Sequence, residues 1–582
     1  MKQKYYTNER NVQIVISLLK QHGIKRVIAS PGTTNMTFIG SIQNDPWFEI
    51  WSSVDERSAA YIACGMAAET GEPVVISCTG ATASRNYYPG MTEAYYRKLP
   101  VLAITSHRGD YQIGHLIDQQ IDRRQIAKDV ALESVVVPLV KDANDEKYCT
   151  IEANKAILAL TQNGGGPAHI NMFTTYSQDF SVKELPPARA IFRHTLSDSL
   201  PALPSGRIGV FISSHRDFTK EETAAIDNFC ASHDAVVFCD HTSSFYGKYA
   251  VHMSLPFAQR DLDTELKHLD LLIHIGEVSG DGYKEYQKRV WRVSEDGALR
   301  DSFNCLSDVF MMPEKSFFER YTTEGERKEN YLNECLALYQ EVYSKLTNIP
   351  FGNIRIAQHL SQRLPINSEI HFGIFNSLRS WNFFQLPEGV KGQCNVGGFG
   401  IDGAVSTMVG ASLANPNRIV FGVFGDLAFF YDMNVIGNRH VGNNLRILLV
   451  NNGKGAEFRL YGHPCSIFGQ EADAYLDAAG HFGNQSEKLV RHYAEDLGYE
   501  YRSASNEAEF ESLVTWFTTP NITEKPLFLE VFTESENESV ALEKVLHLAS
   551  SPAGVFKNRI KATMTNIIGE KGKAVVKKLL RE

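Results

Sequence analysis

The chain has 582 residues, of which 43% are hydrophobic and 22% charged, and its formal net charge is -10 at pH 7. This length predicts about three domains of ordinary size rather than one core. The negative balance argues against nucleic acid as a partner, because nucleic-acid-binding proteins usually present a basic face. No apolar run approaches the ~18 residues of a membrane span, and the N-terminus lacks a secretory cleavage pattern.

Nine cysteines are scattered along the chain without a C-x-x-C pair. This spacing is typical neither of a disulfide framework nor of a zinc site. It favours ordinary buried thiols in a reducing compartment, so we predict a cytoplasmic protein for which membrane contact is not expected.

The first third alternates short β-branched runs with longer amphipathic stretches, which is the pattern of a parallel α/β domain. The runs RVIASPG, EPVVISCTG, LPVLAITS and GPAHINM predict strands. The stretches DERSAAYIACGMAAETG and SRNYYPGMTEAYYRK have helical spacing. The following segment SVKELPPARAIFRHTLSDSLPALPSG is rich in Pro and Ser and predicts a linker.

Two further α/β regions follow the linker. Strands are predicted at RIGVFISS, HDAVVFCD and LDLLIHIG in the middle third, and at INSEIHFG, RIVFGVFGD, LRILLVNN and KPLFLEVF in the last. The charged stretch from Glu326 to Lys345 predicts a helix near their boundary. We therefore predict three consecutive parallel-sheet α/β domains at 1–185, 186–345 and 346–550, followed by a basic helical extension at 551–582.

The extension at 551–582 combines many basic residues with apolar residues at roughly helical spacing. An amphipathic helix for a membrane surface or an acidic partner fits this pattern. A helix packed on its own subunit, with a solvated basic face, fits it as well.

A carboxylate and an amide follow two successive predicted strands of the last domain. Asp426 comes directly after RIVFGVFG, and Asn452 closes LRILLVNN. Ligands of parallel sheets bind outside the carboxyl ends of the strands, and these side chains offer the hard oxygen ligands that Mg²⁺ takes beside phosphate oxygens. Gly425 lets the backbone approach a phosphate, and a helix beginning after Asp426 offers free N–H groups. Turns that cap helices are the alternative at both positions.

The pattern Gly-Asp followed by Asn-Asn resembles the thiamin-diphosphate motif of the decarboxylase and acetolactate-synthase superfamily. Its form Gly-Asp-Leu, with DMN shortly after, is most similar to the menaquinone-pathway 2-succinyl-5-enolpyruvyl-6-hydroxy-3-cyclohexene-1-carboxylate synthases. The resemblance implies a pyrimidine-binding, a central Rossmann-like and a diphosphate-binding domain. It also implies that Asp426 and Asn452 bind Mg²⁺ through their side chains and Lys454 through its carbonyl, although that family usually has a small or acidic residue near the last position.

The segments SPGTTN, VDERSAAYIACGMA and CTGATASRNYYPGMTEAYYRKLPVLAIT resemble the pyrimidine-binding domain of the superfamily in order and spacing. Glu56 falls on the glutamate that this superfamily places against N1′ of the aminopyrimidine. There it favours the imino tautomer that removes the C2 proton of the thiazolium. A glutamate that begins a helix and pairs with Arg57, or stays in solvent, is the alternative.

The resemblance implies further contacts to thiamin diphosphate. Gly398 is a candidate backbone contact to the aminopyrimidine and Ile401 an apolar support for the bent cofactor, with tight turns as the alternative for the glycines. Because the superfamily's cofactor spans two subunits, a homodimer or homotetramer with shared active sites is implied. The full set of candidate cofactor residues is Pro31, Gly32, Thr79, Asn86, Gly398, Ile401, Gly425, Asp426, Leu427 and Asn452.

The arginines with which the menaquinone enzymes hold their carboxylate substrates are replaced in this sequence. Trp381 and Val396 stand at two arginine positions, and the basic residue expected after LDLLIHIG is absent unless Lys284 or Lys288 takes its place. Arg379 lies two positions from a family arginine, and a surface helix residue is its alternative. The candidate substrate residues are Thr33, Thr34, Arg108, Gln119 and Arg379.

Intact cofactor motifs and a changed substrate clamp indicate a thiamin-diphosphate- and Mg²⁺-dependent lyase or transferase. In the superfamily the cofactor ylid adds to a 2-oxo acid, CO₂ leaves, and the acyl carbanion equivalent attacks a carbonyl acceptor or takes a proton. We expect a small 2-oxo acid donor, such as pyruvate, and an acceptor that the sequence does not identify. Carboligation and simple decarboxylation stay open, as do a menaquinone-pathway synthase with a rearranged clamp and a non-catalytic binding module.

Simple decarboxylases of this superfamily commonly carry two adjacent histidines, and this sequence has no such pair. His107, His115 and His463 are single candidates for proton transfer. A surface or structurally bonded histidine is the alternative for each of them.

Overall fold

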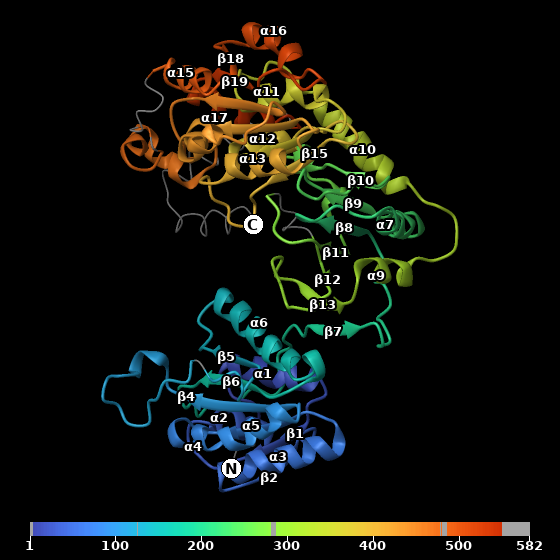
Figure 1. Ribbon diagram of the computed structural model, residues 1–582. Coiled ribbons are helices and arrows are strands. Elements are labelled where there is room, and N and C mark those ends of the chain that lie inside the picture. The colour runs from blue at the N-terminus through green and yellow to red at the C-terminus, as the bar shows by residue number, and fades with distance from the viewer. Residues whose placement is uncertain (1–3, 125, 281–286, 478, 480–485, 550–582) are drawn as a thin grey trace, which may run out of the picture. The chain divides into compact units, whose positions relative to one another are not determined.

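A computed structural model describes residues 4–124, 126–280, 287–477, 479 and 486–549. The chain divides into two compact units (Figure 1). Unit 1 comprises the described residues within 1–200 and 296–311, and unit 2 comprises those within 201–295 and 312–582. In the part of the chain that the structure describes, no helix is long and apolar enough to cross a membrane.

Unit 1 is built on a six-stranded parallel sheet with the order β2-β1-β3-β4-β6-β5. The central strands are buried along their length and therefore read as continuous apolar runs. The strands are β1 (Arg26–Ala29), β2 (Glu49–Ser52), β3 (Val74–Cys78), β4 (Val101–His107), β5 (Glu133–Val137) and β6 (Ala168–Phe173).

Helices cover both faces of this sheet, so unit 1 has three layers (Figure 1). The helices α1 (Arg10–Gln21) and α6 (Ala143–Ala159) pack on one face, and α3 (Glu56–Thr70) and α5 (Tyr88–Tyr96) pack on the other. Two short helices, α2 (Met36–Ile42) and α4 (Ala81–Asn86), follow the ends of β1 and β3. A parallel pair of strands, β7 (Phe192–Thr195) and β13 (Leu306–Met311), also belongs to this unit.

Unit 2 contains two groups of parallel strands. The first has the order β10-β9-β8-β11-β12 and carries helices α7 (Lys220–His233), α8 (Ser254–Phe257), α9 (Glu314–Tyr321) and α10 (Asn330–Tyr343). Its strands are β8 (Ile208–Ile212), β9 (Val236–Cys239), β10 (Ala250–Val251), β11 (Leu271–Ile275) and β12 (Val290–Val293).

The second sheet of unit 2 has six parallel strands in the order β15-β14-β16-β17-β19-β18. They are β14 (Glu369–Phe372), β15 (Lys391–Cys394), β16 (Val420–Gly425), β17 (Leu445–Asn451), β18 (Glu500–Ala504) and β19 (Leu527–Phe532). The accompanying helices are α11 (Asn353–Leu360), α12 (Asn376–Asn382), α13 (Ala404–Ala414), α14 (Asp426–Asp432), α15 (Leu489–Asp496), α16 (Glu507–Phe517) and α17 (Ser535–Leu546).

The two six-stranded sheets share one topology. Counted within each sheet in chain order, both run 2-1-3-4-6-5. The α/β class and its parallel sheets are as the sequence predicts, and each predicted strand is present. The domain boundaries at 185, 345 and 550 stay predictions, and the extension at 551–582 lies outside the described residues.

Two expectations need correction. The Pro- and Ser-rich segment that predicts a linker contains strand β7. The single helix predicted at SRNYYPGMTEAYYRK is two helices, because α4 ends at Asn86 and α5 begins at Tyr88, with a proline in its first turn. Proline removes a backbone donor and suits a helix start, which explains the break.

Candidate functional site

The Asp426 carboxylate lies at the C-terminal end of β16, beside the loop that follows the parallel strand β17. Asp426 is only 3% exposed. Its carboxylate accepts the Leu427 N–H and the Gly453 N–H, each at 2.7 Å. The bond from Gly453 brings the loop that carries Asn452 against the carboxylate, and metal binding by Asp426 and Asn452 stays a prediction.

Lys454, the predicted carbonyl ligand, has its ammonium paired with a neighbouring carboxylate. Its Nζ lies 3.4 Å from Asp473 Oδ2. Its carbonyl accepts the Ala456 N–H at 2.8 Å, which leaves the second lone pair of that oxygen for another partner. Pairing with Asp473 explains how a lysine is tolerated beside a cation site.

The residues at this edge of the sheet fit Mg²⁺ and a diphosphate. Carboxylate, amide and carbonyl oxygens are the hard donors that Mg²⁺ prefers, and it completes its shell with phosphate and water. A Cβ added at Gly425 or Gly398 would meet no atom within 4 Å, so the backbone at both positions faces open space. Within the described residues, no group of three or more His, Cys, Asp and Glu side chains offers an alternative metal cage.

The loop between β15 and α13 contains Gly398 and Ile401 together with a strained aromatic residue. Phe399 has φ +54° and Phe375, which precedes α12, has φ +62°. Their rings meet edge to face with centroids 5.0 Å apart. Left-handed backbone is costly for bulky side chains and tends to occur at functional sites.

Glu56 is the first residue of α3 in unit 1. Asp55 caps this helix by accepting the Arg57 N–H at 3.0 Å, and the Arg57 guanidinium lies 3.3 Å from Asp55 as well. The ion pair of Arg57 is therefore made with Asp55 and not with Glu56. Burial raises the pKa of the Cys78 thiol, at the end of β3, to about 12, and the Glu56 charge adds to this shift. Glu56 thus lies near the carboxyl end of β3.

The predicted loop SPGTTN borders a cavity of about 470 Å³ in unit 1. Pro31 and Gly32 line it. A Cβ on Gly32 would lie 1.9 Å from Thr79 Cγ2, so this loop touches the loop after β3, as a shared cofactor site requires. Thr33 and Thr34 lie in the same loop, and Asn86 is the exposed last residue of α4.

Arg108 and Gln119 lie in the segment that follows β4. The Arg108 guanidinium donates to the Asp118 carbonyl at 2.6 Å. This hydrogen bond holds the loop and uses a donor that a substrate carboxylate would otherwise accept. Gln119 is exposed and has φ +60°. The structure therefore shows Arg108 in a loop-holding contact, and a substrate contact for either residue stays a prediction.

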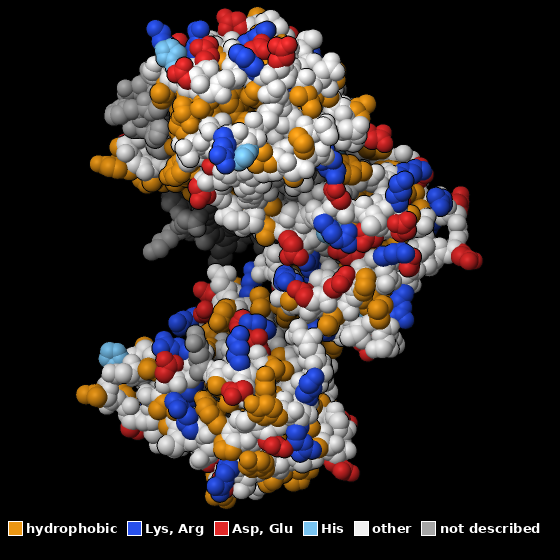
Figure 2. Space-filling model, viewed as in Figure 1, with side chains coloured by type: hydrophobic (Ala, Val, Ile, Leu, Met, Phe, Trp, Pro, Cys, Tyr) orange, Lys and Arg blue, Asp and Glu red, His pale blue; other side chains and the backbone are white. Residues whose placement is uncertain are grey.

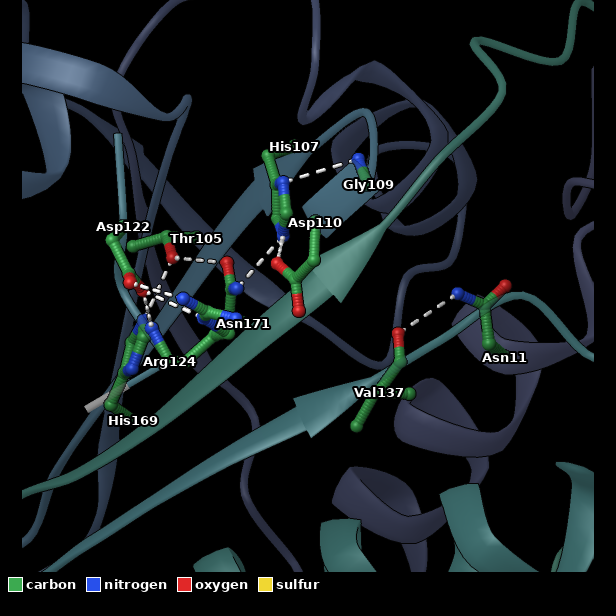
Figure 3. Close-up of polar contacts among 10 residues, drawn as sticks. All are labelled: Asn11, Thr105, His107, Gly109, Asp110, Asp122, Arg124, Val137, His169 and Asn171. Carbon is green, nitrogen blue, oxygen red and sulfur yellow. Dashed lines mark hydrogen bonds and ion pairs between the residues drawn. The ribbon is translucent and has the colours of Figure 1, made fainter. Parts of the chain in front are cut away.

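His107 is a structurally bonded histidine (Figure 3). Its Nδ1 accepts the Gly109 N–H at 3.2 Å, and its Nε2 lies 2.9 Å from the Asn171 amide. Burial, assisted by the charge of Arg123, lowers the pKa of His107 to about 4. The alternative to proton transfer, a structurally bonded histidine, therefore holds for His107.

Comparison with known proteins finds a matching family and similar enzymes. Residues 10–126 match the family described as thiamine pyrophosphate enzyme, N-terminal TPP binding domain. The match lies in the region where the sequence motifs resemble the pyrimidine-binding domain of the thiamin-diphosphate enzyme superfamily. It is similar to the 2-succinyl-5-enolpyruvyl-6-hydroxy-3-cyclohexene-1-carboxylate synthases of Phocaeicola vulgatus, at 28% identity over 93% of this chain and 99% of that protein, and of Flavobacterium johnsoniae, at 27% identity over 91% and 97%.

A solved structure, the thiamine diphosphate-dependent 4-hydroxybenzoylformate decarboxylase of Rhodococcus jostii RHA1, aligns with this chain at a TM-score of 0.40 and 17% identity. The alignment covers 90% of this chain and 99% of that chain.

Outside the superfamily's motifs, the structure shows a buried arginine that sequence reasoning missed. Arg123 is 3% exposed, and within the described residues its Nε and Nη1 have no hydrogen-bond partner. Burial lowers its pKa to about 10. A Cβ on Gly80, the residue after Thr79, would lie 2.9 Å from Nη1. No sequence signal marks Arg123, because its burial depends on the path of the loop after β4.

Arg379, a candidate substrate residue, is neutralised by a carboxylate that the sequence did not single out. Its guanidinium donates to both Glu457 oxygens, at 2.6 and 2.9 Å. Glu457 follows the predicted metal ligand Asn452 by only a short loop. Lys288 is one of two lysines that could replace the basic residue expected after LDLLIHIG, and its Nζ is paired with Asp270 at 2.7 Å. The other, Lys284, lies outside the described residues.

Proposed function

We propose that this protein is a thiamin-diphosphate- and Mg²⁺-dependent lyase or transferase. It decarboxylates a small 2-oxo acid and either passes the acyl unit to a carbonyl acceptor or replaces CO₂ with a proton. The observation that carries the proposal is the buried Asp426 carboxylate, which is held by the Gly453 N–H at the mouth of two parallel strands.

Each group of residues has a defined task in this proposal. Asp426, Asn452 and the Lys454 carbonyl would hold Mg²⁺, and the open backbone at Gly425 would admit the diphosphate. Glu56 would hold a proton at N1′ of the pyrimidine. The cofactor would supply a carbon nucleophile and an electron sink for the decarboxylation.

A menaquinone-pathway synthase with a rearranged clamp is the second candidate, since the similar bacterial proteins carry that name. Trp381 and Val396, at two positions of the family arginines, are 1% and 3% exposed. Apolar side chains buried to this extent stabilise the core and offer no charge to a carboxylate. We therefore favour a substrate with fewer carboxylates, and a non-catalytic binding module ranks third.

We also propose a cytoplasmic homodimer or homotetramer whose active sites combine Glu56 of one subunit with Asp426 of another. The nine cysteines are free thiols, which suits a reducing compartment. Apolar side chains show on the surface of unit 1 (Figure 2). Four large apolar side chains just before α3 or within it are 41–83% exposed, and exposed apolar clusters mark interaction sites; they are Trp51, Val54, Tyr61 and Ile62.

The test is CO₂ release from a panel of small 2-oxo acids with thiamin diphosphate and Mg²⁺ present, beside a Glu56→Gln control. We expect release from at least one acid and its loss in the variant. If the cofactor binds but no acid releases CO₂, the remaining enzymatic possibility is a carboligase that requires its acceptor. A second panel with added aldehydes would detect such an enzyme. Absence of cofactor binding would overturn the enzymatic proposal.

A further inference from the structure

A cavity of about 510 Å³ lies within unit 2. This is the size of ordinary small-molecule sites. Phe399, next to Gly398, and Glu457, in the loop after Asn452, contribute to its wall. The cavity thus adjoins two segments that we assign to the cofactor, which is where a substrate of this superfamily has to lie.

Two arginines line this cavity, and only one has its charge compensated. Arg379 is neutralised by its two-point pair with Glu457. Arg260 is exposed, and its guanidinium stacks on the Tyr461 ring at 4.5 Å. In the described part of the chain, the structure records no ion pair or side-chain hydrogen bond for Arg260.

The backbone of the 461–463 loop holds the Arg260 guanidinium in place. Gly462 has φ +80°, and a Cβ there would lie 2.3 Å from Arg260 Nη2. Only glycine permits this approach without moving the arginine. A guanidinium that stacks on an aromatic face keeps its N–H edge free, and that edge binds carboxylates and phosphates through two points.

An anion bound at Arg260 would have to be a group other than the carboxylate that leaves as CO₂. An arginine paired with that group would stabilise the ground state and lose its partner as the charge moves into the cofactor, which slows the reaction. A pair with an anionic group at the other end of the substrate persists through the transition state. Such a pair contributes binding without opposing the chemistry.

We propose that Arg260 is a specificity-determining residue, which binds a single anionic group at the end of a 2-oxo acid donor distant from its reacting carbonyl. This inference rests on the proposed function and narrows its substrate class to short 2-oxo acids with one distal carboxylate or phosphonate. Arg379 takes no part in this recognition, because its two terminal nitrogens already donate to the Glu457 carboxylate.

The test measures binding by calorimetry to the holoprotein with thiamin diphosphate and Mg²⁺, in a Glu56→Gln background that prevents turnover. The three ligands are 2-oxopentanoate, 2-oxoglutarate and 4-phosphono-2-oxobutanoate, which differ only in the distal group. We expect one of the two distal anions to bind at least about tenfold tighter than 2-oxopentanoate. The preferred anion distinguishes a carboxylate from a phosphonate substrate.

The deciding variants are Arg260→Met, which keeps the apolar stem, and Arg260→Lys. The first is expected to abolish the preference for the anion, and the second to restore part of it. Gly462→Ala, which displaces the guanidinium, is expected to weaken the preference too. Arg502→Met is the matched control, because Arg502 also stacks on an aromatic ring, Trp516, at 4.4 Å and does not line the cavity.

A preference that survives Arg260→Met overturns the inference, as does equal or absent binding of all three acids to protein that has bound its cofactor. Cofactor binding is titrated separately for every variant. Its absence in the parent protein contradicts the proposed function itself, so the two failures are distinguishable.

Discussion

At the scale of single residues, the described histidines illustrate how burial decides protonation. His107 lies in the β4–β6 network with Asn171, and Asp110 and Arg123 are the charged groups that face it. Its ring is neutral at pH 7, because burial and Arg123 lower its pKa to about 4. A group of this kind affects stability only where the unfolded chain takes up a proton and the folded chain does not.

We therefore expect His107 to make the protein less stable as the pH falls from about 6.5 to about 4, and to have no effect above this range. The folded pKa is lower than the unfolded one, so acid favours the unfolded state, by about 3 kcal/mol over the whole range. Urea denaturation of the wild type and of His107→Gln at several pH values checks this. Parallel pH profiles of the two proteins would contradict it.

Candidate site residues that belong to a local sequence motif can be predicted from the sequence. Residues whose role depends on a contact with a residue far away in the chain cannot. Asp426 and Asn452 stand at strand ends in a recognisable pattern, and the structure brings their loops together. The Arg379–Glu457 pair and the stacking of Arg260 on Tyr461 join residues far apart in the chain. Local spacing carries no information about such contacts.

At the scale of elements, the two sheets with the order 2-1-3-4-6-5 explain why both halves of the candidate site lie at loops after strands. Central strands are predicted correctly because burial on both faces makes them continuous apolar runs. The edge strands β2 and β5 were missed. β2 keeps two exposed residues and β5 alternates, so neither has the composition of a buried strand.

Glu538 of α17 joins the starts of two other helices of unit 2. It is 1% exposed, and burial raises its pKa. Its carboxylate accepts hydrogen bonds from the Asn353 N–H at 3.1 Å, at the start of α11, and from the Asn376 amide at 3.1 Å, at the start of α12. α12 carries Arg379 and follows the strained Phe375, so Glu538 supports the wall of the cavity.

Glu538→Ala is expected to lower the free energy of unfolding by about 3 kcal/mol, because it leaves several buried donors without an acceptor. Glu538→Gln keeps one acceptor and is expected to cost less. Urea denaturation of both variants measures the difference. A loss below about 0.5 kcal/mol for the alanine variant, the level of a surface substitution, would show that these bonds do not hold the helices.

At the scale of the whole molecule, the proposal places Glu56 and Asp426 of one active site on different subunits. This makes a prediction for mixtures of two inactive proteins, Glu56→Gln and Asp426→Ala. In a mixed dimer one active site contains both substitutions, and the other contains the unchanged Glu56 and Asp426. After unfolding and refolding of an equal mixture, we expect about a quarter of the wild-type activity, since half of the dimers are mixed.

Activity in the mixture requires that the two residues come from different chains. No recovery, with mixed dimers confirmed by differently tagged subunits, would place Glu56 and Asp426 of each site on the same chain. Either result is independent of which 2-oxo acid is the substrate.

Calorimetric titration of the apoprotein with thiamin diphosphate, once with Mg²⁺ and once with EDTA, tests whether Asp426 and its loop bind the cofactor through a metal ion. We expect binding that requires Mg²⁺ and that Asp426→Ala abolishes, while Glu56→Gln retains most of it because the residues around the diphosphate are intact. Binding that is equal in EDTA, that survives Asp426→Ala, or that is absent from the wild type would contradict a Mg²⁺-dependent thiamin-diphosphate site at Asp426.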